Sequence, residues 1–112
     1  KEELKGRDYM MQKIKESDVI VYIGGITSRL EGEEMPVKID GFDKGDRTNL
    51  KLPKVQHEFL KELKNTGKPV VFVMTGGSAM AINWEQENLS AILNIWYPGQ
   101  AAGDAVADVL FG

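Results

Sequence analysis

Two short apolar runs constrain the fold of this chain most strongly. Residues 19–23 (Val-Ile-Val-Tyr-Ile) and residues 69–74 (Pro-Val-Val-Phe-Val-Met) are almost continuously apolar and rich in β-branched side chains. Strands of a parallel sheet with helices packed on both faces have this composition. The two runs therefore predict strands of one sheet that are covered on both sides.

Helical patterns alternate with these strands along the chain. The expected elements, in order, are a surface helix over residues 3–16, the strand 19–23, a helix over residues 53–66, the strand 69–74, a short helix or loop facing water at 79–90, a strand at 91–96, and a last helix whose apolar face holds Ala101, Ala105, Val106, Val109 and Leu110. This alternation builds a parallel sheet through right-handed crossovers.

We therefore expect an α/β protein, a three-layer α/β/α sandwich of the flavodoxin-like type around a mostly parallel sheet. Three strands are few for such a sheet, which predicts a truncated domain with at least one further strand before residue 1. The chain starts at Lys1 rather than a methionine and stops at Gly112, directly after an apolar helix. We expect residues 1–112 to be one domain excised from a longer polypeptide.

Composition excludes several classes of function. With 112 residues the chain fits a single domain, and its net charge of -3 gives no basic surface for nucleic acid. It has no cysteine, so thiolate metal sites and thiol nucleophiles are absent. No apolar run approaches the ~20 residues of a membrane span. The compartment stays open, with a periplasmic or extracellular location favoured over a cytoplasmic one.

A long polar segment, residues 24–53, follows the first strand and is the predicted functional region. In open α/β sheets the ligand site lies beyond the carboxyl ends of the strands, where this segment begins. It carries carboxylates at Glu31, Glu33, Glu34, Asp40, Asp43 and Asp46. Clustered carboxylates raise one another's pKa and suit acid/base chemistry, but a solvated acidic loop is the simpler interpretation. A calcium site is less favoured, since the spacing lacks the twelve-residue pattern.

Other polar and aromatic features carry weaker signals. His57 lies on the polar side of its helix without a nucleophile beside it, which predicts an exposed histidine. The turn at residues 76–78 (Gly-Gly-Ser) matches neither the dinucleotide pattern nor the P-loop. Trp84, Trp96 and Tyr97 could stack on a sugar ring, although such residues near strand ends more often complete a core or an inter-domain face.

Several segments together resemble the C-terminal α/β-sandwich domain of glycoside hydrolase family 3, the β-glucosidases and β-xylosidases. They extend from about residue 17 to the end and are Ser17-Asp18-Val19-Ile20-Val21, Leu30-Glu31-Gly32-Glu33-Glu34, Gly45-Asp46-Arg47-Thr48-Asn49-Leu50, Leu52-Pro53 with Gln56, Gly67-Lys68-Pro69-Val70-Val71, Trp96-Tyr97-Pro98-Gly99-Gln100 and Ala107-Asp108-Val109-Leu110-Phe111-Gly112. The two C-terminal blocks, together with the upstream Gly-Asp-Arg, are the most specific part.

The resemblance implies part of a retaining hydrolase of β-linked glucosides or xylosides, with no cofactor and no metal. In that family the nucleophile is an aspartate of an N-terminal (β/α)8 barrel, and the general acid/base is commonly a glutamate of this second domain. Glu33 matches the acid/base position best, and Glu31 is the runner-up. Arg47 is expected to be structural, pairing with a carboxylate at the base of the loop.

The resemblance also implies partners: a glycoside or oligosaccharide substrate and the barrel of the same parent chain. Without the barrel this fragment is expected to be inactive, and its exposed sheet edges and uncovered apolar face favour self-association. Two other hypotheses remain open. The segment could belong to a non-catalytic binding or packing domain, or to a flavodoxin-like regulatory domain with a ligand at the turns after Gly24 or Gly76.

Overall fold

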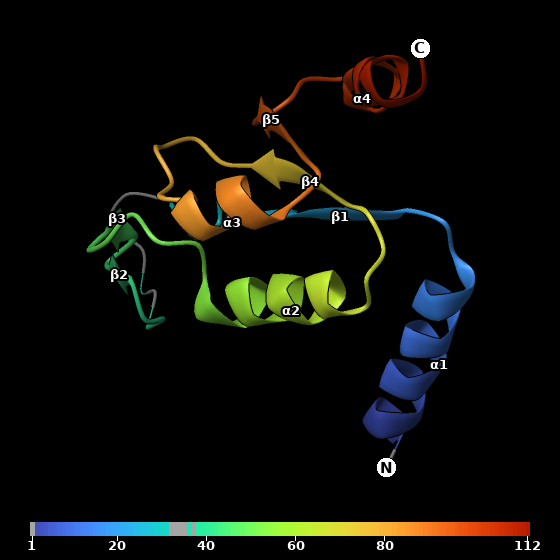
Figure 1. The fold of residues 1–112 in the computed structure, drawn as a ribbon. Helices are drawn as coiled ribbons and strands as arrows, with labels where there is room; N and C mark the ends of the chain where they lie inside the picture. Colours follow the sequence, from blue (N-terminus) through green and yellow to red (C-terminus); the bar gives the residue numbers. More distant parts are fainter. Residues whose placement is uncertain (1, 32–35, 37) are drawn as a thin grey trace.

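The computed structural model describes the whole chain except residues 1, 32–35 and 37. Its elements, in chain order, are α1 (Glu2–Glu16), β1 (Ile20–Gly25), β2 (Phe42–Asp43), β3 (Asp46–Arg47), α2 (Lys54–Asn65), β4 (Val70–Thr75), α3 (Asn83–Asn88), β5 (Ala91–Trp96) and α4 (Ala102–Phe111) (Figure 1). The expected α/β class is confirmed, and the predicted strands and helices are all present, with bounds that differ by a few residues.

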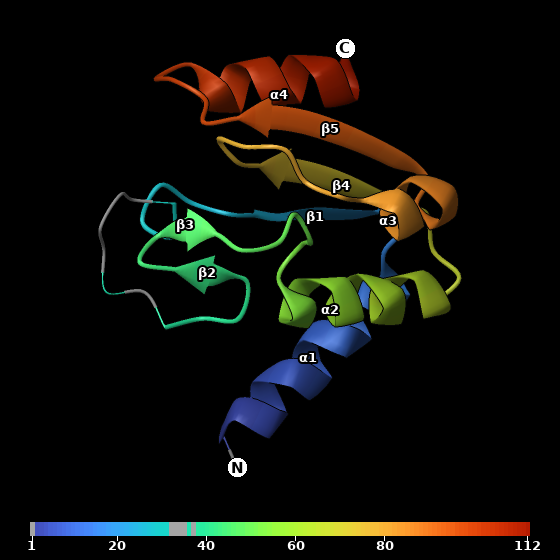
Figure 2. The ribbon, with the colours of Figure 1, turned by 90° about the vertical axis from the view of Figure 1, so that its left-hand side faces the viewer.

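A three-stranded parallel sheet forms the centre of the fold. Its strand order is β1-β4-β5, so the middle strand is the most apolar one, residues 70–75. Ile20 pairs with Val70 and Gly25 with Thr75, while Val71 pairs with Ala91 on the other side. Because all strands run the same way, the ends of β1, β4 and β5 lie at one edge of the sheet (Figure 2).

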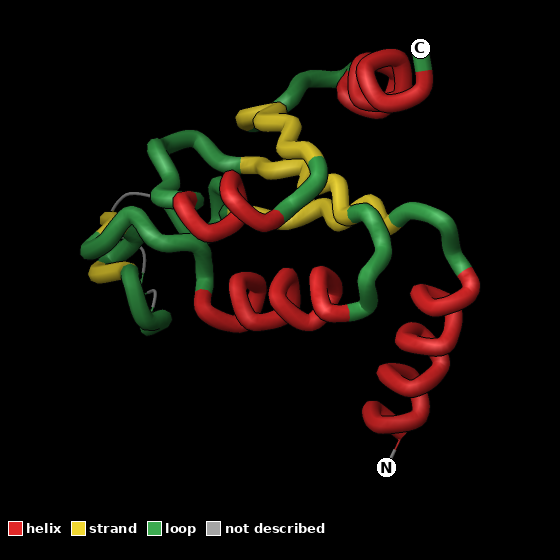
Figure 3. The backbone as a smooth tube through the Cα atoms, in the orientation of Figure 1, coloured by secondary structure: helices red, strands yellow, loops and turns green. Residues whose placement is uncertain are grey.

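The core lies between the sheet and the helices α2 and α3, which cover the same face (Figure 3). Leu60 and Leu63 are the buried residues of α2, as the apolar stripe predicted. They pack in one cluster with Phe72 of β4 and Ile20 of β1. Residues that point to this face alternate along each strand with residues that point away, so this cluster lies on one side of the sheet.

The opposite face of the sheet is only partly covered. Val21 and Ile23 of β1 are 42% and 65% exposed, and α4 buries none of its residues. A groove of about 410 Å³ separates α4 from this face of the sheet. The prediction that the first strand is covered on both faces is therefore wrong for the residues described, because α4 stands off from it.

The segment around α3 also differs from the prediction. Glu85, expected to face water, is only 2% exposed, and its Oε1 lies 2.6 Å from Nδ1 of His57 on α2. The ring of Trp84 packs edge-on against His57 at 5.4 Å between centroids. His57 is thus half-buried and paired, because α3 folds back onto α2 and brings a carboxylate to it.

Two smaller parts complete the fold. The helix α1 points away from the sheet (Figure 1), and its Arg7 pairs with Glu62 of α2 at 2.5 Å. Within the long polar segment, β2 and β3 pair as a short antiparallel hairpin that was not expected from the sequence. The hairpin lies near the edge where the strands of the main sheet end (Figure 2).

Replacing Leu60 with alanine tests the location of the core. Leu60 has no exposed surface, so the cavity left by Leu60→Ala should lower the free energy of unfolding by about 2–5 kcal/mol. Val55→Ala on the same helix is the matched control, since Val55 is 76% exposed and its loss should change stability by less than about 1 kcal/mol. Equal effects in urea titrations would contradict this assignment of the core.

Candidate functional site

The candidate site is a polar cleft at the edge where the parallel strands end. It has a volume of about 500 Å³ and is open to solvent. Its walls come from the long polar segment, the turn after β4 and the turn after β5: Ser28, Glu31, Gly45, Asp46, Arg47, Gly77, Ser78 and Tyr97. Open α/β sheets bind ligands at this edge, because loops from several strands converge there.

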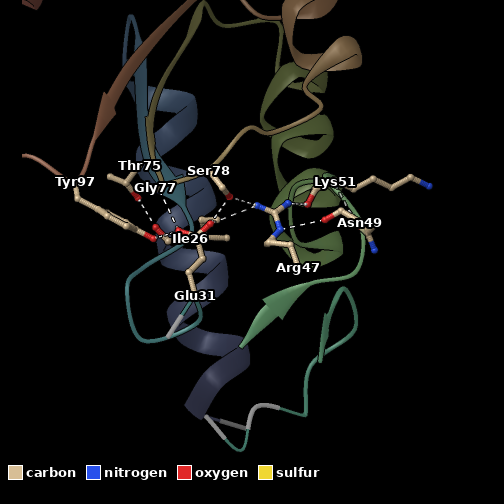
Figure 4. Close-up of polar contacts among 9 residues, drawn as sticks. All are labelled: Ile26, Glu31, Arg47, Asn49, Lys51, Thr75, Gly77, Ser78 and Tyr97. Carbon is tan, nitrogen blue, oxygen red and sulfur yellow. Dashed lines mark hydrogen bonds and ion pairs between the residues drawn. The ribbon is translucent and has the colours of Figure 1, made fainter. Parts of the chain in front are cut away.

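Glu31 lies at the centre of the polar contacts in this cleft (Figure 4). Its Oε2 accepts a hydrogen bond from the backbone N–H of Gly77 at 3.0 Å and one from the hydroxyl of Tyr97. Its Oε1 accepts a hydrogen bond from the hydroxyl of Ser78, and Nη1 of Arg47 lies 3.9 Å away. One carboxylate therefore joins the long polar segment to the turns that follow β4 and β5.

Arg47 holds the other end of the polar segment. Its Nη1 donates to the Ser78 hydroxyl at 3.2 Å, and its other nitrogens donate to the carbonyl oxygens of Asn49 at 3.1 Å and Lys51 at 3.0 Å. Its side chain is 9% exposed, and the guanidinium lies over the ring of Phe42. The expectation that Arg47 lies at the base of the loop beside a carboxylate agrees with these contacts.

Two glycines allow this close packing. Gly25 has φ of +117°, and a side chain there would meet the carbonyl oxygen of Thr75 at 2.0 Å. A Cβ on Gly77 would lie 2.5 Å from the Tyr97 ring and 3.0 Å from the Glu31 carboxylate. Only glycine therefore lets the turn after β4 come close enough for its N–H to reach Glu31.

The hydrogen-bond donors around Glu31 decide its charge. Burial acts to raise its pKa, but the hydrogen bonds from Ser78, Tyr97 and Gly77 and the charge of Arg47 outweigh it, so the pKa lies below the ordinary value. Burial and the hydrogen bond to Glu31 raise the pKa of Tyr97 to about 12. Near neutral pH the cleft therefore holds an ionised Glu31 beside a neutral Tyr97.

The acidic residues predicted as a cluster are not all brought together. Glu31 and Asp46 line the same cleft, whereas Asp43 is an exposed residue of β2. Glu33 and Glu34 lie outside the described residues. Among the residues that the structure describes, no group of three histidine or carboxylate side chains could hold a metal ion.

Sequence reasoning missed the roles of Ser78 and Tyr97 at this site. The Gly-Gly-Ser turn was weighed only as a phosphate-binding pattern, and Tyr97 only as a stacking residue. Tyr97 follows β5 directly and Ser78 lies in the turn after β4, a neighbouring strand of the same parallel sheet, which is the signal that could have placed them beside Glu31. Trp96, at the end of β5, has φ of 56°, which is uncommon for a bulky residue, and the chain bends there before Tyr97.

Comparisons with known proteins identify the family of this chain. A family model described as the glycosyl hydrolase family 3 C-terminal domain matches residues 4–112. The chain belongs to glycosyl hydrolase family 3. The resemblance expected from the sequence is thereby confirmed.

Relatives in family 3 include enzymes named for xylosides and for glucosides. A xylan 1,4-beta-xylosidase of Xylanibacter ruminicola is 56% identical over 100 residues, which are 89% of this chain and 12% of that protein. A periplasmic beta-glucosidase of Salmonella typhimurium is 35% identical over 105 residues, or 94% of this chain and 12% of that protein. The chain thus spans 12% of the length of these relatives.

Solved structures agree with the sequence comparison. The beta-glucosidase from Listeria innocua, determined in complex with gluconolactone, superposes with a TM-score of 0.72 and 28% sequence identity. The match covers 88% of this chain and 12% of that protein. The parallel sheet and the helices described above therefore have the fold of a segment of a family 3 β-glucosidase.

The Tyr97–Glu31 contact predicts a step in stability at alkaline pH. Because the folded-state pKa of Tyr97, about 12, exceeds the ordinary value of 10.0, its contribution to stability is present below pH 10 and lost as pH rises toward 12. Burial also raises the pKa of Tyr22, so Tyr97→Phe should reduce this step, and the phenolate absorbance near pH 12, rather than abolish them. Tyr9→Phe, which removes an exposed tyrosine of α1, is the control. A step of unchanged size in Tyr97→Phe would contradict the assignment.

Proposed function

We propose that this family 3 domain is part of a retaining β-glycosidase that removes terminal glucosyl or xylosyl residues, and that its polar segment supplies the general acid/base to a neighbouring (β/α)8 barrel. Support comes from the family match over residues 4–112 and from relatives named beta-glucosidase and xylan 1,4-beta-xylosidase. The cleft at the carboxyl edge of the sheet, from which the polar segment extends, is consistent with this role.

The surroundings of Glu31 favour Glu33 as the acid/base. A general acid must hold a proton near neutral pH, which requires a pKa raised above the ordinary value of a carboxyl group. The pKa of Glu31 is shifted the other way, and its oxygens are already engaged by Gly77, Ser78 and Tyr97. This argument supports the first choice made from the sequence and assigns Glu31 a different task.

In the proposed reaction the two carboxyl groups act in turn. An aspartate of the barrel attacks the anomeric carbon while Glu33 protonates the leaving oxygen, and Glu33 then activates a water that releases the sugar. In retaining enzymes the two carboxyl groups stand ~5–5.5 Å apart. The segment that carries Glu33 must therefore reach the barrel, and the contacts of Glu31 and Arg47 anchor its two ends on this domain.

The second candidate is a non-catalytic domain whose polar segment only packs beside a substrate held elsewhere. The fixed, ionised Glu31 and the structural contacts of Arg47 are compatible with that role as well.

A periplasmic or extracellular location is proposed on the name of the Salmonella typhimurium relative. Among the described residues no helix is both long and apolar enough to span a bilayer.

Replacing Glu33 in the full-length parent enzyme separates the two candidates. Glu33→Gln removes the proton donor, so turnover of substrates with poor leaving groups should fall by about 10²–10⁴-fold. Aryl glycosides with good leaving groups should react nearly normally in the first step, and azide should restore turnover by trapping the glycosyl enzyme. Glu58→Gln, at an exposed position of α2, is the control. Near-normal rates in Glu33→Gln would favour the packing domain.

A further inference from the structure

We infer that Glu31 is a positioning residue of glycoside hydrolysis: its carboxylate ties the start of the polar segment, two residues before Glu33, to the turns after β4 and β5. This inference rests on the proposed function of Glu33. The observation that carries it is the convergence of donors from Gly77, Ser78 and Tyr97 on one side chain that is 12% exposed.

Covalent geometry links the two glutamates. Glu33 follows Glu31 by two residues, and two residues of extended chain span at most about 7 Å. The backbone of Glu31 is itself held, because its N–H donates to the carbonyl oxygen of Thr27 at 3.2 Å. Glu31 is therefore fixed at both its backbone and its side chain, and it lies within two residues of the proposed acid/base.

The same contacts close the polar segment at its base. Arg47, near the far end of the segment, meets Glu31 at 3.9 Å and shares Ser78 with it. Arg47 also holds the carbonyl oxygens of Asn49 and Lys51. The two ends of the stretch between residues 31 and 47 are thus joined to each other and to the sheet edge.

The chemistry of the donors selects a carboxylate at this position. An ionised carboxylate only accepts hydrogen bonds, and here the backbone N–H of Gly77 and the guanidinium of Arg47 cannot reverse their roles. In Glu31→Gln, one oxygen becomes an NH₂ group that points at donors. The variant keeps the size of the side chain but loses the charge and at least one acceptor. It should therefore weaken the contacts between the polar segment and the sheet edge without opening a cavity.

The test compares Glu31→Gln with Glu33→Gln in the full-length parent enzyme. We expect Glu31→Gln to lower kcat by about 10–100-fold, because misplacing a catalytic group by on the order of 1 Å can reduce the rate by about 100-fold. KM should change little, the loss should be the same for good and poor leaving groups, and azide should not restore turnover. Tyr97→Phe, which removes one donor and keeps the Glu31 charge, should lose less than Glu31→Gln. Glu58→Gln serves again as the control.

A structural readout accompanies the kinetics. The amide hydrogens of Leu30 and Glu31, which bond to Thr27, should exchange faster in Glu31→Gln than in the wild-type enzyme. If Glu31→Gln does not fold, Ser78→Ala removes a single donor and should give a smaller loss of the same type.

The outcomes separate the inference from the proposed function. Wild-type turnover in Glu31→Gln, or unchanged amide exchange, would overturn the positioning role and leave Glu33 as the proposed acid/base. Azide rescue of Glu31→Gln would identify Glu31 as the acid/base and overturn both. If Glu33→Gln is fully active, the proposed function fails. The positioning role then fails as well, even if amide exchange shows that Glu31 holds the start of the polar segment.

Discussion

Parallel pairing of β1, β4 and β5 is the constraint on which the site depends. The register that places Gly25 beside Thr75 also brings the three following turns to the same edge of the sheet. Antiparallel strands would send neighbouring turns to opposite ends. A carboxylate on the first turn can therefore accept hydrogen bonds from residues that are 46 to 66 positions later in the sequence.

The Glu31 contacts turn that topology into a defined geometry. Most loops on a protein surface are held by few contacts and move more than the sheet that carries them. Here a charge-assisted cluster connects the polar segment to two strand ends, and such hydrogen bonds are stronger than neutral ones. One carboxylate accepts all of these hydrogen bonds, so the cluster acts as a unit rather than as separate bonds.

Local sequence patterns predicted the elements well but not what covers them. The apolar runs predicted the strands, and the regular spacing of apolar residues predicted α2, because a helix that buries one face needs apolar side chains at helical intervals. Coverage of β1 by α4 and the pairing of His57 with Glu85 depend on where distant helices settle, which no local pattern contains. Arg47 was predicted at the base of the loop through the family resemblance, whereas the partners Ser78 and Tyr97 emerge only from strand order.

Two glutamates separated by one glycine can serve opposite purposes because their surroundings differ. Hydrogen-bond donors around a carboxyl group lower its pKa, so the group stays ionised and can hold a structure together. A general acid needs a raised pKa, which fewer hydrogen bonds and more burial or nearby negative charge provide. Glu31 meets the first condition in full. The anchor stands two residues before the proposed acid/base in the sequence, so the contacts that fix the start of the polar segment to the sheet edge lie next to the residue proposed for catalysis.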